Sequence, residues 1–156
     1  MKLLVVSDSH GNVDALRNIL ITHYDRSDMI IHLGDGEKDY ESVIKHLPVP
    51  SVFVRGNCDF ASSAPDLKII EVEGKRILCT HGYRYSVKYG LSSLKSAARD
   101  QKVDMVLFGH THNAHVEYDD GLYVVNPGSV GWRCMEPSFA FIDVIKSGIL
   151  PNIVHI

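Results

Sequence analysis

The chain has 156 residues, of which 45% are hydrophobic and 22% are charged, and its formal net charge is -3. This length is enough for one domain with a hydrophobic core, and the composition is that of an ordinary soluble globular protein. The charge gives no electrostatic reason to expect a nucleic-acid partner, because no basic stripe stands out along the sequence.

Cysteine usage and the N-terminal segment both predict a cytoplasmic protein. Cys58, Cys79 and Cys134 are an odd number of cysteines without CxxC spacing, which fits a reducing compartment better than a disulfide framework. The N-terminal apolar run Leu3–Val6 is far too short for the core of a signal peptide or for a membrane span. We therefore expect no association with a membrane.

Short apolar runs recur along the chain and indicate strands that are buried on both faces of a mostly parallel sheet. In chain order, these runs are Leu3–Val6, Met29–Leu33, Val52–Val54, Ile77–Cys79 and Met105–Phe108. Segments between them place apolar residues on one helical stripe. This spacing predicts helices over Asn12–Tyr24, Asp39–Leu47 and about Leu91–Gln101.

The second half of the chain favours β-hairpins, because turn residues separate pairs of strand-forming segments. The predicted pairs are Leu67–Val72 with Arg76–Thr80, Val116–Tyr118 with Leu122–Val125, and Phe139–Ile145 with Ile153–Ile156 across the segment Lys146–Pro151. Together with the helices, they predict an α/β fold in which two packed β-sheets are flanked by helices. We expect residues 1–156 to form a single domain.

Each of five apolar strands ends in a short polar segment that contains Asp, His or Asn. These segments are Ser7–Asn12, Gly34–Gly36, Arg55–Asp59, His81–Gly82 and Gly109–His112. The carboxyl ends of the strands form the binding crevice in open α/β sheets, so we expect the five segments to converge.

The side chains in these segments are suitable ligands for Mn²⁺, Fe²⁺ or Zn²⁺. The candidate metal ligands are Asp8, His10, Asp35, Asn57, His81, His110 and His112. Asp8 and His10 are two residues apart, as are His110 and His112, and on an extended strand this spacing points both side chains the same way. Seven ligands are too many for one ion with an open position, which favours two ions about 3.5–4 Å apart that share one carboxylate. Asp35 is the natural bridge because it stands alone in its segment.

The charge of such a centre suits a phosphate ester. Two divalent ions carry four positive charges, and Asp8, Asp35 and a bridging hydroxide would together remove three of them. We expect Mn²⁺ first, with Fe²⁺, Ni²⁺ or Zn²⁺ as alternatives, since nitrogen and oxygen ligands accept all four.

The order of these motifs resembles that of the calcineurin-like metallophosphoesterases. The matching motifs are Asp8-x-His10, Gly34-Asp35, Gly56-Asn57, His81 and Gly109-His110-Thr111-His112. The segment Asn126-Pro127-Gly128-Ser129 also matches a signature of the small single-domain bacterial and archaeal branch. The resemblance spans residues 3–129 and implies a fold of two β-sheets flanked by helices.

The resemblance also implies how the seven ligands divide over two ions. One ion would be held by Asp8, His10, Asp35 and His112. The other would be held by Asp35, Asn57, His81 and His110, which are also the candidate catalytic residues. We expect a hydroxide that bridges the ions to attack phosphorus in line, with both ions and the nearby imidazoles stabilising the developing charge.

One position departs from the larger enzymes of the family, which usually carry a proton-donating His after the Gly-Asn pair. Cys58 stands there in this chain, and a thiol with an ordinary pKa of about 8.5 is a poorer acid for a leaving alcohol. This substitution favours small phosphodiesters with good leaving groups as substrates. The alternatives are a phosphomonoesterase or nucleotide-directed hydrolase, and a weak or inactive protein-interaction scaffold like a eukaryotic trafficking-coat subunit of this fold.

Retention of every metal ligand argues against the scaffold. Members of the family often form homodimers, and the sequence leaves the oligomeric state open. We expect substrate specificity to lie in rim loops such as Phe60–Pro65 and Arg84–Gly90. We expect Asn12 to cap the first helix, with a substrate contact as the alternative. We expect His32 to be a buried core residue, with a supporting contact to a metal ligand as the alternative. Asp59 either orients a neighbouring ligand or closes its turn.

Overall fold

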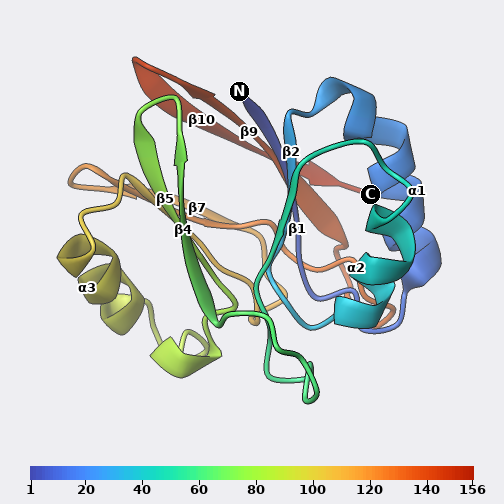
Figure 1. Ribbon diagram of the computed structural model, residues 1–156. Helices are drawn as coiled ribbons and strands as arrows, with labels where there is room; N and C mark the ends of the chain where they lie inside the picture. The colour runs from blue at the N-terminus through green and yellow to red at the C-terminus, as the bar shows by residue number, and fades with distance from the viewer.

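The computed structural model describes residues 1–156 and contains two five-stranded β-sheets packed face to face (Figure 1). The first sheet has the strand order β10-β9-β1-β2-β3, formed by Gly148–His155, Ser138–Ile145, Lys2–Val6, Met29–His32 and Ser51–Phe53. The second has the order β4-β5-β6-β8-β7, formed by Leu67–Val72, Lys75–Thr80, Met105–Leu107, Leu122–Asn126 and His115–Asp119. The predicted pair of packed sheets is confirmed.

Both sheets are mixed, whereas the apolar runs alone suggested a mostly parallel arrangement. Strands β1, β2 and β3 are parallel, as are β5, β6 and β8. The hairpins add antiparallel pairs: β9 with β10, β4 with β5, and β7 with β8. The apolar runs correctly identified the central strands, because these strands are covered on one face by the other sheet and on the other face by helices.

The main core lies between the two sheets. Leu3, Val5 and Ile31 of the first sheet pack there with Ile77 and Leu107 of the second, and all five side chains are fully buried. Because successive strand residues point to opposite faces, the intervening residues of β1 face outward into a second cluster beneath the helices. The strand ends are thereby held at fixed places along one edge of the molecule.

Helices cover the outer faces of the sheets (Figure 1). Helices α1 (Val13–His23) and α2 (Glu37–Ile44) pack on the first sheet, and α3 (Ser92–Asp100) packs on the second. Two short 3₁₀ helices, η1 (Tyr24–Arg26) and η2 (Tyr83–Tyr85), complete the elements. No helix combines the length and apolar character needed to cross a lipid bilayer.

Capping side chains explain where two of the predicted helices begin. Asn12 precedes α1, and its side-chain oxygen accepts a hydrogen bond from the backbone N–H of Ala15 at 3.3 Å, which confirms the predicted cap. Helix α2 begins at Glu37, two residues before the predicted start at Asp39. The reason is tertiary, because the distant Asp59 carboxylate accepts the backbone N–H of Glu37 at 3.0 Å.

The third hairpin is tighter than predicted. Strand β10 begins at Gly148, whereas the sequence placed the whole segment Lys146–Pro151 in the turn. Pro151 lies within the strand, opposite Ile142. A proline is tolerated there because β10 is an edge strand, which needs hydrogen bonds on one side only.

Candidate metal centre

The ends of strands from both sheets are tied together at one edge of the molecule. The backbone N–H of Asp8 donates to the carbonyl of Gly34 at 3.0 Å, and the N–H of Gly109 donates to the carbonyl of His81 at 3.1 Å. The Asp8 carboxylate joins the two sheets, because its Oδ2 accepts the backbone N–H of His110 at 3.0 Å. The predicted convergence of the strand ends is therefore seen in the fold.

Five of the candidate ligands adopt a left-handed backbone conformation. The φ angles are 54° at Asp8, 44° at His10, 56° at Asp35, 68° at His110 and 61° at His112. Non-glycine residues pay about 1–3 kcal/mol for such sparsely populated conformations, which cluster at functional sites. The expectation that these pairs lie on extended strands is therefore wrong. Their side chains converge because the backbone turns at each ligand.

Six candidate ligands form two groups of three. Asp8, His10 and His112 have ligand atoms within 4.8 Å of one another, and so do the atoms of Asp35, His81 and His110. Within the first group, Asp8 Oδ1 lies 3.2 Å from His112 Nε2. Within the second, Asp35 Oδ2 lies 3.3 Å from His81 Nε2.

The two groups lie side by side. His10 Nε2 lies 3.6 Å from Asp8 Oδ1 and 3.7 Å from Asp35 Oδ2. His81 Nε2 likewise lies 3.9 Å from Asp8 Oδ1, although it belongs to the other group. The two groups of ligand atoms therefore share neighbours, and Asp35 lies on the boundary between them.

The surroundings of one buried oxygen atom, Asp8 Oδ1, indicate that these residues fit a cation. Asp8 Oδ1 is buried and has no hydrogen-bond partner, although Nε2 atoms of His112, His10 and His81 surround it at 3.2, 3.6 and 3.9 Å. A buried carboxylate oxygen without a partner is costly. A cation bound between this oxygen and the imidazoles would satisfy it, so the side chains present fit a divalent metal.

The His81 ring is held in the orientation that a metal ligand needs. Its Nδ1 lies 2.7 Å from the carbonyl oxygen of Leu33. A carbonyl can only accept, so Nδ1 carries a proton and Nε2, which faces Asp35, is the ring atom that a metal would use once it is deprotonated. Such an outer contact is typical of metal-binding histidines and fixes both the tautomer and the ring. Burial would lower the pKa of His81, but the Asp35 and Asp8 carboxylates raise it above its ordinary value in the metal-free protein.

Asn57 and Cys58 occupy the third strand end. The Asn57 side chain is exposed, and its amide donates to Cys58 Sγ at 3.4 Å. Cys58 Sγ lies within ligand range of His10 and Asp35, a role that the sequence did not suggest. Partial burial, together with the neighbouring Asp35 carboxylate, raises the pKa of Cys58 to about 11.

In the metal-free centre, the histidines and carboxylates shift one another's pKa values. Burial alone would raise the pKa of Asp8 and Asp35, but the surrounding histidines more than offset it and lower both values. Contact with Asp8 raises the pKa of His10, whereas burial and the His81 charge lower that of His110 to about 4. Metal binding would therefore release protons and strengthen with rising pH.

Asp59 positions the loop that carries Asp35. Its carboxylate accepts four backbone N–H groups, from Asp35, Gly36, Glu37 and Gly56, at 2.8–3.0 Å. This contact answers the question left open by the sequence, because Asp59 orients a ligand loop as well as closing its own turn.

Two glycines allow the loop that carries Asp35 to contact the loop that carries Asn57. A Cβ built on Gly56 would lie 2.1 Å from Asp35 Oδ1, and one built on Gly34 would lie 2.5 Å from the nitrogen of Gly56. Both distances are shorter than any real Cβ contact, so neither position has room for a side chain. Glycine is thus required at both for the ligand loops to meet.

The Asn126–Ser129 turn supports the centre from behind. Asn126 Nδ2 donates to the carbonyl of Gly109 at 2.8 Å, and Ser129 Oγ donates to the carbonyl of Asp8 at 2.9 Å. Both side chains are buried. The turn therefore has a structural role, fixing two backbone segments that carry ligands.

The comparison with known sequences is decisive for the family. The model of the calcineurin-like phosphoesterase superfamily domain matches residues 1–147. This chain belongs to that superfamily. It is 35% identical over 131 residues to a probable metallophosphoesterase, YsnB of Bacillus subtilis (strain 168), covering 83% of this chain and 75% of that protein. It is 25% identical over 167 residues to phosphodiesterase MJ0936 of Methanocaldococcus jannaschii, covering 94% and 95%.

Solved structures share the fold of this metallophosphoesterase. A predicted phosphoesterase from Streptococcus pneumoniae TIGR4 aligns with a TM-score of 0.82 at 22% identity, covering 99% of this chain and 88% of that one. Vps29 from Entamoeba histolytica, solved with Zn²⁺, aligns with a TM-score of 0.77 at 21% identity, covering 99% of each chain. At such identities, the likeness speaks for the fold alone.

Removal of the Asp59 carboxylate is expected to loosen the Asp35 loop. In Asp59→Ala four backbone N–H groups lose their acceptor, so Mn²⁺ affinity should fall about 10–100-fold and stability by about 1–3 kcal/mol. Calorimetric titration with Mn²⁺ and urea denaturation measure the two effects. Asp14→Ala is the matched control, since the Asp14 side chain is 83% exposed. Unchanged affinity in folded Asp59→Ala would contradict this role.

His32 should make the metal-free protein sensitive to acid. Burial lowers its pKa to about 4, whereas an unfolded chain has an imidazole pKa of about 6.5. As the pH falls from 7 to 4, His32 becomes protonated in the unfolded state but stays largely neutral in the folded state. The free energy of unfolding therefore decreases by on the order of 3 kcal/mol. Denaturant titrations at several pH values should show a flatter pH dependence in His32→Gln. Parallel curves for the two proteins would exclude this effect.

Proposed function

We propose that this chain is a single-domain dinuclear phosphodiesterase that hydrolyses small phosphodiesters. Asp8, His10, Asp35 and His112 would hold one ion. Asp35, Asn57, His81 and His110 would hold the other, with Asp35 shared. Support comes from the two adjacent groups of ligand atoms and from the unpartnered Asp8 oxygen between them. The family model that the chain matches is that of the calcineurin-like phosphoesterase superfamily domain.

The chemistry divides between the ions and the side chains. When bound, two divalent ions supply Lewis acidity and a nucleophile that is available at neutral pH. The chain's own carboxylates and imidazoles would hold the two ions, and the Leu33 carbonyl fixes the orientation of the His81 ring. In the metal-free protein, the pKa of Cys58 is raised to about 11, which makes its thiol a weak acid toward a leaving alcohol. Substrates with good leaving groups should therefore react best.

Two cavities that both adjoin His10 favour a diester over a monoester. One, of about 460 Å³, is lined by His10, His112 and Trp132 among others. The other, of about 380 Å³, is lined by His10, Asp35 and Phe60 among others. A phosphodiester has two ester arms to place beside its phosphorus atom, whereas a monoester has one. Both volumes lie in the range of small-molecule sites.

The scaffold alternative has weaker support. The Vps29 neighbours share the fold at a sequence identity that carries no functional argument. Against a purely structural role stands the retention of all seven candidate ligands, five of them in left-handed conformations. A protein without chemistry at this edge would have no reason to keep that strain or an unpartnered buried oxygen.

The proposed function is tested by hydrolysis of bis(p-nitrophenyl) phosphate and p-nitrophenyl phosphate by metal-stripped protein with and without Mn²⁺. We expect Mn²⁺ to restore turnover and kcat/KM for the diester to exceed that for the monoester by at least about tenfold. Asp35→Asn should lose at least about 100-fold through weakened ligation, while Asp143→Asn, at a surface ion pair with Lys2, should match the wild type. If neither ester is hydrolysed with Mn²⁺, Fe²⁺, Ni²⁺ or Zn²⁺, the proposed function is wrong and the protein-interaction scaffold is the remaining alternative.

Replacement of Cys58 tests whether its thiol is needed for hydrolysis. We expect Cys58→Ala to hydrolyse bis(p-nitrophenyl) phosphate within about threefold of the wild type, because the p-nitrophenolate leaving group needs no proton and the thiol is a weak acid. The control is Cys79→Ala, at a fully buried position, where any loss reflects folding. A fall of Cys58→Ala to the level of Asp35→Asn would show that Cys58 is essential.

A further inference from the structure

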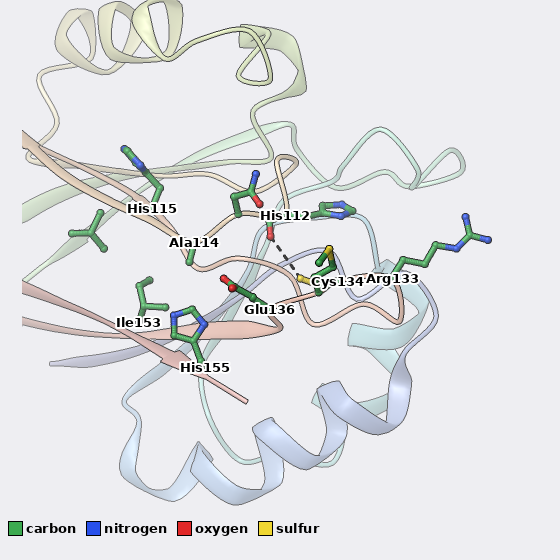
Figure 2. Close-up of a pocket in the computed structure, with 11 residues that line it drawn as sticks. His112, Ala114, His115, Arg133, Cys134, Glu136, Ile153 and His155 are labelled. Atoms are coloured by element: carbon green, nitrogen blue, oxygen red, sulfur yellow. Dashed lines mark hydrogen bonds between the residues drawn. The ribbon is translucent and has the colours of Figure 1, made fainter.

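A groove leads away from the metal centre at His112. The cavity beside His10 and His112 shares His112, Arg133 and Cys134 with a larger one of about 760 Å³ between the edge strands β7 and β10. In Figure 2 the His112 ring lies at one end of this larger groove, His115 and His155 lie toward the other end, and Arg133 extends beyond His112. The segment after β8 that supplies Arg133 was not among the predicted rim loops.

Arg133 is the one arginine of the chain without a partner in the protein. The other six arginines contact a carboxylate or an imidazole: Arg17, Arg26, Arg55, Arg76, Arg84 and Arg99. Arg133 makes no hydrogen bond or ion pair and is exposed beside two cavities. A guanidinium that is always charged and has five free donors is suited to binding phosphate oxygens in pairs.

Trp132 adds a free aromatic face to the same cavity. It is 70% exposed and lines the cavity together with His10, His112 and Arg133. Large aromatic side chains normally bury most of their surface, and exposed ones beside a cationic group are typical of sites that stack nucleobases. Trp132 and Arg133 line the same cavity, so one ligand can contact both.

The two sides of the metal centre differ in charge. The Trp132 cavity is lined by one fixed cation, Arg133, and by no carboxylate. The Phe60 cavity, in contrast, is lined by one lysine, Lys38, and by four carboxylates, Asp35, Glu37, Asp39 and Asp59. An anionic ester arm is attracted to the first side and repelled by the second.

We propose that Trp132 and Arg133 form a subsite for a nucleotide arm of the diester, with Trp132 stacking on the base and Arg133 binding a second phosphate that does not react. The substrate class is thus a phosphodiester in which one alcohol is a phosphorylated nucleoside. The uncharged arm lies on the Phe60 side. This inference rests on the proposed function and adds to it the identity and orientation of the substrate.

Three p-nitrophenyl diesters with a common leaving group test the subsite. Their second arms are methyl, thymidine, and thymidine carrying a 3′-phosphate. In the wild type we expect kcat/KM to rise by about tenfold from methyl to thymidine and by about tenfold again with the 3′-phosphate. Arg133→Gln should reduce the second ratio to about one, and Trp132→Ala the first, while Trp132→Phe keeps most of it. Arg17→Gln, at a surface ion pair on α1, should retain both ratios.

Fluorescence provides a second readout, because Trp132 is the only tryptophan of the chain. Thymidine 3′,5′-bisphosphate should quench its emission saturably, with a Kd at least about tenfold weaker in Arg133→Gln, and methyl phosphate should not quench it. Equal kcat/KM for all three diesters in the wild type, or no quenching by the bisphosphate, would overturn the subsite. Hydrolysis of none of the diesters with any metal would instead refute the proposed function, and the quenching would still report on the subsite.

Discussion

The buried Asp8 carboxylate is the constraint around which this edge of the molecule is organised. It is fully buried, and a buried charge is tolerated only when its surroundings compensate it. Its Oδ2 accepts the backbone N–H of His110 from the second sheet, and its backbone carbonyl accepts Ser129 Oγ. Its Oδ1 faces three imidazoles without a hydrogen bond. The same residue therefore joins the sheets and leaves one oxygen free for a cation.

Close contact between the backbones of Gly34 and Gly56 organises the loops that carry Asp35 and Asn57. Gly34 and Gly56 have no room for a Cβ, and the Asp59 carboxylate holds the adjoining backbone by accepting four N–H groups. The left-handed conformations of the ligands persist because these contacts over-determine them. Local strain at this edge is thus balanced by the packing of two sheets behind it.

The surroundings of the metal centre are less symmetric than the centre itself. Carboxylates that organise the Asp35 loop also make the Phe60 side negative, whereas the turn that supports Asp8 continues into the exposed Trp132 and Arg133. Structural residues therefore influence the charge that a substrate meets. In the proposed function, the same contacts that position the ligands would favour one orientation of an anionic substrate.

The sequence by itself determined the strands, the helices and the identity of the candidate ligands. Apolar runs bounded by polar segments are local signals, and the convergence of strand ends follows from the topology of α/β sheets. It also correctly assigned Asn12 as a helix cap and His32 as a buried residue. These assignments depend on neighbours within a few positions, which a single sequence displays.

Only the tertiary structure decided how the ligands turn inward and what lies around them. His10 and His112 meet across 102 positions of sequence, and both have left-handed φ angles in loops that follow strands of different sheets. Asp59 could be recognised as the organiser of the Asp35 loop, and Trp132 and Arg133 as neighbours of His112, only after the chain had folded. Sequence patterns report periodicity along the chain, whereas these contacts arise from the packing of two sheets against each other.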